Sequence, residues 1–216
     1  MKRFYNIEEQ RKWNYEEMWT NDGHEWSKSF GTTENLWNVY IFDTIKQFRN
    51  KRILEIAPGY GRMTQFLSIL ASQLIVIDLN ARCIEKTREK LGHHIHEYFV
   101  NDGKSLTGIG DNTQNLVFSF DSFVHFHKNV TEEYIKEIRR VLKPGGYGFI
   151  HHSWVYKASD YSFNNIGGRA NMSPEEFRGI VESNNMRIIS QKEIQFDGDE
   201  HWPGKDCISF FMKPEQ

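Results

Sequence analysis

Short apolar runs alternate with longer amphipathic stretches along most of this chain. Runs rich in β-branched residues predict strands, and apolar positions spaced three or four residues apart predict helices. The predicted strands cover residues 52–57, 74–78, 97–100, 115–120, 147–151, 186–196 and 206–212. The predicted helices cover residues 34–49, 63–71, 81–91 and 131–142, and a further helix begins after Ser173. This alternation indicates a mostly parallel sheet with helices on both faces.

Several predicted elements carry local signals at their ends. Ser173 followed by Pro174 is typical of a helix start, because serine caps the helix and proline suits its first position. Thr131 is the predicted cap of the preceding helix, which ends at Lys143 and Pro144. The last two predicted strands follow each other without a helix between them. They are therefore expected to form an antiparallel hairpin at one edge of the sheet.

The length of the chain limits its domain organisation. With 216 residues, of which 38% are hydrophobic, the chain suits one well-packed domain better than two. We expect this domain to cover residues 34–216. Residues 1–33 are rich in aromatic side chains, including Trp13 and Trp19, and are predicted to form an N-terminal helical lid. Two interpretations stay open, because such a segment either packs onto the domain or covers a small-molecule pocket.

Charge and apolar content exclude several classes of partner. A formal net charge of −2 offers no general excess of positive charge, so we do not expect a nucleic-acid partner. No apolar run approaches the roughly 18 residues of a membrane span, and we expect a cytoplasmic protein without membrane contact. Cys83 and Cys207 are too few for a disulfide framework and are expected to be buried thiols. The charged residues within 136–140 are expected to form a solvated helix face.

Two glycines and two carboxylates follow the predicted strands in a pattern that indicates a nucleoside cofactor. Gly59 and Gly61 come directly after a strand, where the absence of a Cβ lets the backbone approach a ligand. Asp78 ends the second strand, where a carboxylate accepts hydrogen bonds from ribose hydroxyls. Asp102 ends the third strand, where an adenine amino group can donate to it. A nicotinamide dinucleotide is disfavoured, because its fingerprint asks for glycine or alanine where Thr64 stands.

These motifs resemble those of class I S-adenosylmethionine-dependent methyltransferases. Residues 54–61 look like the first motif of that family, with Ala57 where glycine is usual. The strand ending at Asp78 is similar to the ribose-binding motif, and residues 101–103 are similar to the adenine-contacting turn. The resemblance covers about residues 34–212. It implies a Rossmann-like α/β fold, with a seven-stranded, mostly parallel sheet and an antiparallel edge hairpin.

The resemblance also implies S-adenosylmethionine as the cofactor and a set of residues that bind it. The predicted cofactor-binding residues are Glu55, Ala57, Gly59, Gly61, Arg62, Asp78, Leu79, Asn101, Asp102, Gly103 and Phe120. Within the class, residues 118–126 and 148–153 look most like bacterial small-molecule and carbohydrate O-methyltransferases.

A hydroxyl that attacks a methyl group benefits from losing its proton, and histidine has a suitable pKa for the base. His125 lies just past the fourth predicted strand, four residues after Asp121. This region is similar to phosphobase methyltransferases, in which the matching histidine acts with an N-terminal tyrosine. Tyr15 or Tyr5 is the candidate for that partner in this chain. The alternative is that His125 begins a helix and bonds to the backbone.

Two adjacent histidines end the fifth predicted strand. Neighbouring side chains on a strand point to opposite faces, so at most one of His151 and His152 is expected to face the site. We expect His152 to do so, and we assign it a catalytic role with Asp121 and His125. A divalent metal held by Asp121, His125 and one of the pair is an alternative, since carboxylate and imidazole suit such ions. No metal site is predicted.

The stretch between residues 153 and 171 is irregular and rich in aromatic and amide side chains. Loops of this length are often functional, and aromatic faces beside amides suit a sugar ring. Arg169 suits a phosphate or carboxylate. The predicted acceptor-binding residues are Tyr15, Trp154, Tyr156 and Arg169. The alternative, that the aromatic side chains only pack the loop down, stays open.

The sequence therefore predicts an O-methyltransferase that acts on a hydroxyl of a sugar, a glycan precursor or a related small metabolite, with His125 as general base. One alternative is methylation of an amine, carboxylate or phosphate on another small molecule or peptide. Another is an S-adenosylmethionine-binding module without catalysis. The expected partner is a small-molecule acceptor.

Overall fold

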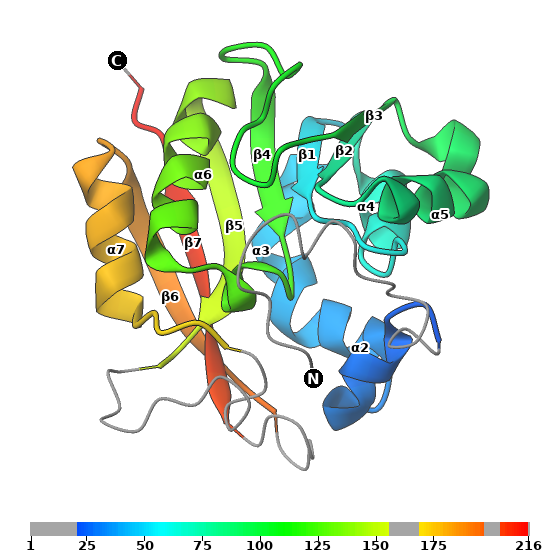
Figure 1. Cartoon of the computed structure of the whole chain (residues 1–216), viewed down its shortest axis with the longest axis horizontal. Coiled ribbons are helices and arrows are strands. Elements are labelled where there is room, and N and C mark those ends of the chain that lie inside the picture. Colours follow the sequence, from blue (N-terminus) through cyan, green and yellow to red (C-terminus); the bar gives the residue numbers. More distant parts are fainter. Residues whose placement is uncertain (1–20, 156–168, 197–203, 216) are drawn as a thin grey trace. The chain divides into compact units, whose positions relative to one another are not determined.

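The computed structural model describes residues 21–155, 169–196 and 204–215. Its backbone divides into two compact units, with the boundary between Gly103 and Lys104 (Figure 1). Much of the predicted lid, residues 1–33, falls on residues 1–20 and lies outside the described residues. The lid therefore stays a prediction. Within the described ranges, no helix is long and apolar enough to cross a membrane.

The N-terminal unit begins with a helical path rather than the single α-helix predicted over residues 34–49. After a 3₁₀ helix, η2 (His24–Phe30), the path runs through α2 (Thr33–Leu36), the π-helical η3 (Trp37–Phe42), α3 (Asp43–Ile45) and the 3₁₀ turn η4 (Lys46–Phe48). The predicted apolar side is confirmed at Leu36, Ile41 and Ile45, which are fully buried. The changes of pitch bring Trp37 onto Phe66, with ring centroids 4.8 Å apart.

Three parallel strands follow in this unit. They are β1 (Arg52–Ile56), β2 (Gln73–Asp78) and β3 (Glu97–Val100), in the order β3-β2-β1. The connecting helices are α4 (Thr64–Leu70) and α5 (Ala81–Leu91), and the 3₁₀ turn η5 (Gly92–His94) precedes β3. Helix α5 packs on β2 and β3. It begins where the Asn80 side chain accepts a 2.8 Å hydrogen bond from the backbone N–H of Arg82, a local cap.

The C-terminal unit contains four strands and two long helices. Strand β4 (Gln114–Ser119) runs parallel to β5 (Leu142–Ser153), which pairs antiparallel with β7 (Lys205–Met212), and β7 pairs antiparallel with β6 (Arg187–Gln195). The 3₁₀ turn η6 (Phe123–His125) and α6 (Lys128–Val141) follow β4, and α7 (Pro174–Ser183) precedes β6. Helices α6 and α7 lie side by side over β5, β6 and β7 (Figure 1). The seven-stranded sheet, mostly parallel with an antiparallel pair at its edge, confirms the predicted fold class.

One helix start was predicted correctly and one was not. Ser173 caps α7 through a capping box, in which its hydroxyl accepts from Glu176 N at 3.2 Å and the Glu176 carboxylate accepts from Ser173 N at 3.0 Å. Helix α6 begins at Lys128 instead of Thr131, and its capping residue, His127, makes no side-chain cap. Thr131 is buried within the helix. Packing of the apolar side of α6 therefore outweighs the local threonine signal.

Strand β5 begins five residues earlier than predicted, at Leu142, and contains Pro144 and the following glycines. Tertiary pairing explains this extension, because Gly145 N donates to Lys213 O and Lys213 N donates to Gly146 O, both at 2.9 Å. Further along, Gly148 is required because a Cβ there would collide with the ring of Phe211 on β7.

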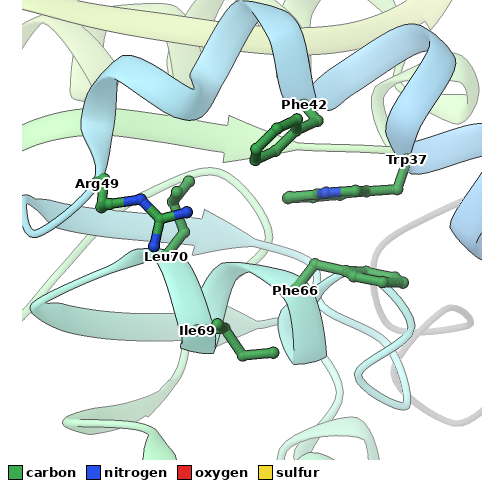
Figure 2. Close-up of a pocket in the computed structure, with 6 residues that line it drawn as sticks. All are labelled: Trp37, Phe42, Arg49, Phe66, Ile69 and Leu70. Carbon is green, nitrogen blue, oxygen red and sulfur yellow. The ribbon is translucent and has the colours of Figure 1, made fainter.

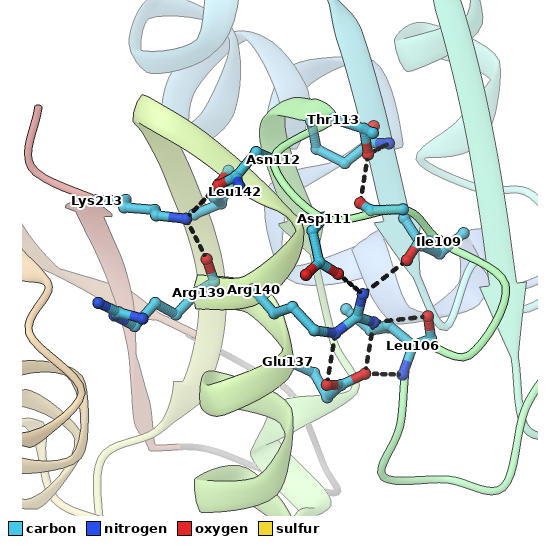
Figure 3. Close-up of polar contacts among 12 residues, drawn as sticks. Leu106, Ile109, Asp111, Asn112, Thr113, Glu137, Arg139, Arg140, Leu142 and Lys213 are labelled. Atoms are coloured by element: carbon cyan, nitrogen blue, oxygen red, sulfur yellow. Dashed lines mark hydrogen bonds and ion pairs between the residues drawn. The ribbon is translucent and has the colours of Figure 1, made fainter. Parts of the chain in front are cut away.

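Arg140 and Glu137 of α6 are not the solvated face that the sequence predicts. Arg140 donates to both Glu137 oxygens at 2.8 Å, to Asp111 at 2.6 Å, and to the carbonyls of Leu106 and Ile109 at 3.1 and 2.8 Å (Figure 3). Glu137 in turn accepts from Leu106 N at 2.9 Å. The pair thereby holds the loop that leads into β4.

A buried lysine also fastens the C-terminal end of this helix. The Lys213 ammonium donates to Asn112 Oδ1 at 2.6 Å and to the carbonyls of Arg139 and Leu142 at 2.8 Å (Figure 3). These two carbonyls lie at the C-terminal end of α6, where backbone acceptors lack partners within the helix. Burial lowers the Lys213 pKa from its ordinary value.

We predict that Arg140→Met lowers the free energy of unfolding by about 2 kcal/mol, because two loop carbonyls and Glu137 lose a charged donor. Denaturant unfolding measures the change. Lys136→Met on the same helix is the matched control, because its ion pair with Glu133 is exposed and should matter much less. Equal effects of the two substitutions would contradict the prediction.

Candidate functional site

The turn after β1 uses left-handed backbone at three positions. The φ angles are +58° at Ala57, +59° at Gly59 and +86° at Gly61. Glycine adopts such angles without steric cost, whereas a residue with a Cβ is strained there. The angle at Ala57 gives a physical reason why glycine is usual at this position of the motif. The Ala57 N–H compensates by donating to Ile77 O of β2 at 2.8 Å.

Asp78, at the end of β2, holds the same turn. Its carboxylate accepts from Gly59 N at 3.3 Å and from Asn80 N at 2.8 Å. The Thr87 hydroxyl of α5 donates to Gly59 O at 2.8 Å. Burial raises the Asp78 pKa to about 6, although the backbone N–H groups oppose the shift. The carboxylate is thus placed beside the glycine turn, where backbone N–H groups rather than a counterion bind it.

Glu55 is a second buried carboxyl group beside this turn. Its side chain is 2% exposed, and burial raises its pKa to about 8, with Asp78 adding to the shift and Thr64 and Arg62 opposing it. Its Oε2 atom has no hydrogen-bond partner among the described residues. Leaving a buried polar oxygen without a donor is costly. A ligand that brings a donor to this oxygen would remove the cost, so the residue fits a bound polar cofactor.

The end of β3 completes the cofactor side of the N-terminal unit. Asn101 N donates to Asp78 O at 3.0 Å, and Asn101 Oδ1 accepts from Gly103 N at 3.1 Å, which closes a tight turn around Asp102. Leu79 continues β2 and contributes a backbone N–H to Asp78. The structure therefore gathers the predicted residues of three strand ends, as a parallel sheet requires.

Arg62 is also at this side, and it is tied to the residues before the domain. It is 7% exposed and donates to Ser27 Oγ at 3.1 Å. Ser27 accepts from Thr33 Oγ1 at 3.0 Å, and Thr33 lies 2.7 Å from His24 Nδ1. Desolvation and the cations Arg62 and Lys90 lower the His24 pKa. This series of hydrogen bonds could not be predicted, because no local sequence pattern in residues 24–33 indicates it.

Two cavities lie in the N-terminal unit. One, of about 120 Å³, is lined by Trp37, Phe42, Arg49, Phe66, Ile69 and Leu70 (Figure 2). It lies between the first helical path and α4 and contains no predicted site residue. The other, of about 260 Å³, is lined by His24, Gly61, Gln65, Lys90 and Leu91. It reaches the glycine turn at Gly61.

In the C-terminal unit, a second strained turn follows β4. Asp121 has a φ of +64°, and its N–H donates to His151 Nδ1 at 3.1 Å. His125 ends η6, and its N–H donates to Ser122 O at 3.0 Å, so that two of the three predicted catalytic residues, Asp121 and His125, share one tight turn. Strained non-glycine residues cluster at functional sites. The predicted cofactor residue Phe120 stacks on His151, with ring centroids 4.3 Å apart.

The structure reverses the expected orientation of the histidine pair. His152 is 1% exposed, stacks on Phe177 of α7 at 4.0 Å, and places its nitrogens 2.8 Å from Ser153 O and Ser209 Oγ. Burial lowers its pKa to about 3, so it stays neutral within the core. His151 points to the other face of β5, where it meets Asp121. As predicted, the two side chains point to opposite faces of β5. The prediction that His152 faces the site is wrong, because the sequence does not show which face of β5 is covered by α7.

Arg169 corrects a second prediction. Instead of presenting its charge to an acceptor, it donates to Asp206 Oδ2 through Nη2 at 2.8 Å and through Nε at 3.1 Å. The ion pair is buried, and Arg169 also lies over the Phe196 ring. Burial alone would raise the Asp206 pKa, but Arg169 and His151 hold it below its ordinary value.

The remaining acceptor candidates are only partly described. Tyr15 and Tyr156 lie outside the described residues. Trp154 is described, with the Lys205 ammonium 4.5 Å from its ring centroid, and its buried indole Nε1 has no hydrogen-bond partner within the part of the chain that the structure describes. Within residues 21–155, 169–196 and 204–215, no group of three or more His, Cys, Asp or Glu side chains is placed to hold a metal ion. Both cysteines are buried and free, as expected.

Comparison with known proteins connects this geometry to a family. Residues 53–146 match the model of a methyltransferase domain. The chain is 28% identical to phosphoethanolamine N-methyltransferase 1 of Triticum aestivum over 124 residues, which cover 56% of this chain and 25% of that protein. It is 30% identical to the ubiquinone/menaquinone biosynthesis C-methyltransferase of Proteus mirabilis over 128 residues, which cover 55% of this chain and 48% of that protein. The matched segments thus span at most about half of these relatives.

A solved structure extends the likeness of the fold over nearly the whole chain. An S-adenosylmethionine-dependent methyltransferase from Clostridium acetobutylicum superposes with a TM-score of 0.71 at 11% sequence identity, covering 93% of this chain and all of that one. This likeness supports the fold, while the family match lies over the strand ends described above. Residues 53–146 therefore match a methyltransferase domain, and the fold is that of S-adenosylmethionine-dependent methyltransferases.

Proposed function

We propose that this chain transfers a methyl group from S-adenosylmethionine to a hydroxyl of a sugar, a glycan precursor or a related small metabolite, with His125 as general base. The observation that carries the proposal is the shared turn after β4, where strained Asp121 and His125 lie together at a strand end. In folds of this type, ligands bind at the carboxyl ends of the strands. The relatives include N- and C-methyltransferases, so the choice of an oxygen acceptor rests on this chain's own residues.

The donor side is supported by the three strand ends of the N-terminal unit. Asp78 offers carboxylate oxygens for ribose hydroxyls, and Asp102 is the candidate for the adenine amino group. Glu55 keeps a buried oxygen for a polar donor. When bound, S-adenosylmethionine supplies an electrophilic methyl group on a positively charged sulfur.

The acceptor side then requires one proton transfer. The acceptor oxygen forms a bond to the methyl carbon, the carbon–sulfur bond breaks, and its electron pair stays on sulfur. The hydroxyl proton passes to the His125 imidazole, which afterwards releases it to solvent. Asp121 is the candidate to orient the acceptor or the base from the same turn.

Two observations favour a neutral acceptor. The formal net charge of −2 gives no general attraction for a nucleic acid. The guanidinium of Arg169, the predicted anion-binding group, is engaged by buried Asp206. A phosphorylated amine, as in the name of the wheat relative, would need another cation at the acceptor site. A nucleic acid, an amine and a carboxylate are therefore secondary candidates.

The pKa of Asp78 predicts how cofactor binding depends on pH. Its raised value of about 6 means that the carboxylate becomes protonated as the pH falls through 6, and then accepts more weakly from ribose hydroxyls, because it loses its charge and one oxygen becomes a donor. We compare binding of S-adenosylhomocysteine, the demethylated product, between pH 7 and pH 5, because Glu55, whose pKa is about 8, stays protonated across that range. At pH 5 we expect binding roughly tenfold weaker, because a single protonation changes affinity tenfold per pH unit. Isothermal titration calorimetry measures this.

Two variants separate Asp78 from other titrating groups. Asp78→Asn should bind more weakly and lose the pH dependence between pH 5 and 7. Asp102→Asn should also bind more weakly but keep that dependence, because the raised carboxyl pKa belongs to Asp78. Wild-type affinity that does not change between pH 7 and pH 5 would contradict the assignment of Asp78.

His125→Gln tests the proposed base. We expect kcat to fall roughly 10²- to 10⁴-fold, because proton transfer is lost, while S-adenosylhomocysteine binds as before. The assay follows an isotope-labelled methyl group into a panel of sugars, polyols, amines and carboxylates, with the product atom identified by mass spectrometry. His127→Gln is the matched control, since His127 is exposed at the start of α6. Full turnover by His125→Gln would refute the assignment, and transfer only to amines or carboxylates would refute O-methylation.

A further inference from the structure

One buried polar network in the C-terminal unit has three members without a role in the proposed methyl transfer. The three are His151 on β5, Asp206 on β7 and Arg169, and the network joins them to Asp121 at the end of β4. His151 and Asp206 are completely buried. Burying ionisable groups costs free energy of folding unless they are well paired.

The sheet register explains why these side chains meet. In the antiparallel pairing of β5 with β7, Ser153 lies opposite Asp206, and His152 lies opposite Cys207. Opposed residues point to the same face, and every second residue of a strand shares that face. His151 and Asp206 are therefore on one face, while His152 is on the face covered by α7. His151 Nε2 consequently lies 3.4 Å from Asp206 Oδ2.

The contact with Asp121 defines the tautomer of His151. Because the Asp121 N–H donates to Nδ1 at 3.1 Å, Nδ1 is the acceptor nitrogen and Nε2 carries the proton. That proton is on the side of Asp206, whose negative charge Arg169 stabilises at 2.8 Å. The ring is also held between Phe120 at 4.3 Å and Phe196 at 5.9 Å. The imidazole is thus fixed in tautomer, position and plane.

What His151 holds is the backbone of the proposed catalytic turn. Asp121 has a φ of +64°, a conformation that is strained for a non-glycine residue and persists only when its surroundings impose it. The N–H of this residue bonds to His151. The network reaches the same turn a second time, because Ala170, next to Arg169, donates from its N–H to Val124 O at 2.6 Å. Val124 immediately precedes His125.

We propose that His151 is a positioning residue, which holds Asp121 in its left-handed conformation and thereby sets the orientation of the turn that carries His125. Asp206 and Arg169 act through it by fixing the imidazole. The inference rests on the proposed function, because the turn that His151 holds carries the proposed base, His125. A misplacement of about 1 Å at a reacting group lowers turnover roughly 100-fold.

Two substitutions at position 151 form a matched pair. In His151→Asn, the side-chain carbonyl falls near the place of Nδ1 and still accepts from the Asp121 N–H. In His151→Gln, the longer amide reaches the place of Nε2 and leaves that N–H without an acceptor. Ser209→Ala is the control for general destabilisation, because Ser209 is fully buried and bonds His152 on the opposite face.

The first readout needs no acceptor substrate. Nuclear magnetic resonance of the whole chain with bound S-adenosylhomocysteine should show scalar coupling between the Asp121 amide nitrogen and His151 Nδ1. In His151→Gln the Asp121 amide should exchange with solvent at least roughly tenfold faster, whereas His151→Asn and Ser209→Ala should stay close to wild type. Absence of the coupling, or equal exchange in the Asn and Gln variants, would overturn the proposal. If His151→Gln does not fold, Asp206→Asn replaces it and should weaken the coupling.

The second readout is turnover on the acceptor found in the panel. We expect His151→Gln to lower kcat roughly 10- to 100-fold with an unchanged KM for S-adenosylmethionine, and His151→Asn to recover most of the loss. Equal kcat in the two variants would overturn the positioning role. If the wild type transfers no methyl group to any hydroxyl, the proposed function fails, while the coupling and exchange still decide whether His151 holds the turn.

Discussion

In each unit, the candidate site residues depend on left-handed backbone at the end of a parallel strand. Ala57 after β1 and Asp121 after β4 both have φ near +60°, although neither is glycine. Each is held by a hydrogen bond from its own N–H, to the Ile77 carbonyl in one case and to the His151 imidazole in the other. The chain must turn sharply where it leaves a buried strand, and this turn brings loop atoms to the ligand-binding edge. The strain is thus localised where chemistry is expected.

The pKa values of two buried carboxyl groups, Asp78 and Asp206, are shifted in opposite directions because their partners differ. Asp78 accepts hydrogen bonds from backbone N–H groups, and burial raises its pKa to about 6. Asp206 is equally hidden but pairs with Arg169, which holds its pKa below the ordinary value. Desolvation disfavours charge in both cases, and only a nearby cation reverses its effect. Asp78 and Glu55 therefore suit a ligand that brings hydrogen-bond donors. Asp206 already has its counterion, Arg169, within the protein interior.

Local signals predicted the parts of the structure that local physics controls. The capping box at Ser173, the glycine turn at Gly59 and the buried strand ending at Asp78 are each formed by neighbouring residues, and each was found. The predicted start of α6 was wrong, because packing of the apolar side of the helix extends it to Lys128. Arg140 was misjudged for a related reason, since its loop partners are about 30 residues away in the sequence.

The sequence by itself determined the class of fold and the positions at which β1, β2 and β4 end, where the candidate site residues lie. These follow from hydrophobic period and from residues adjacent along the chain. Only the tertiary structure decided that His151 rather than His152 meets Asp121, and that Arg169 neutralises Asp206 instead of facing an acceptor. The register between β5 and β7 and the face covered by α7 set those partners. The register and the covered face both depend on contacts between segments that are distant in the sequence. The alternation of side chains along one strand does not determine either of them.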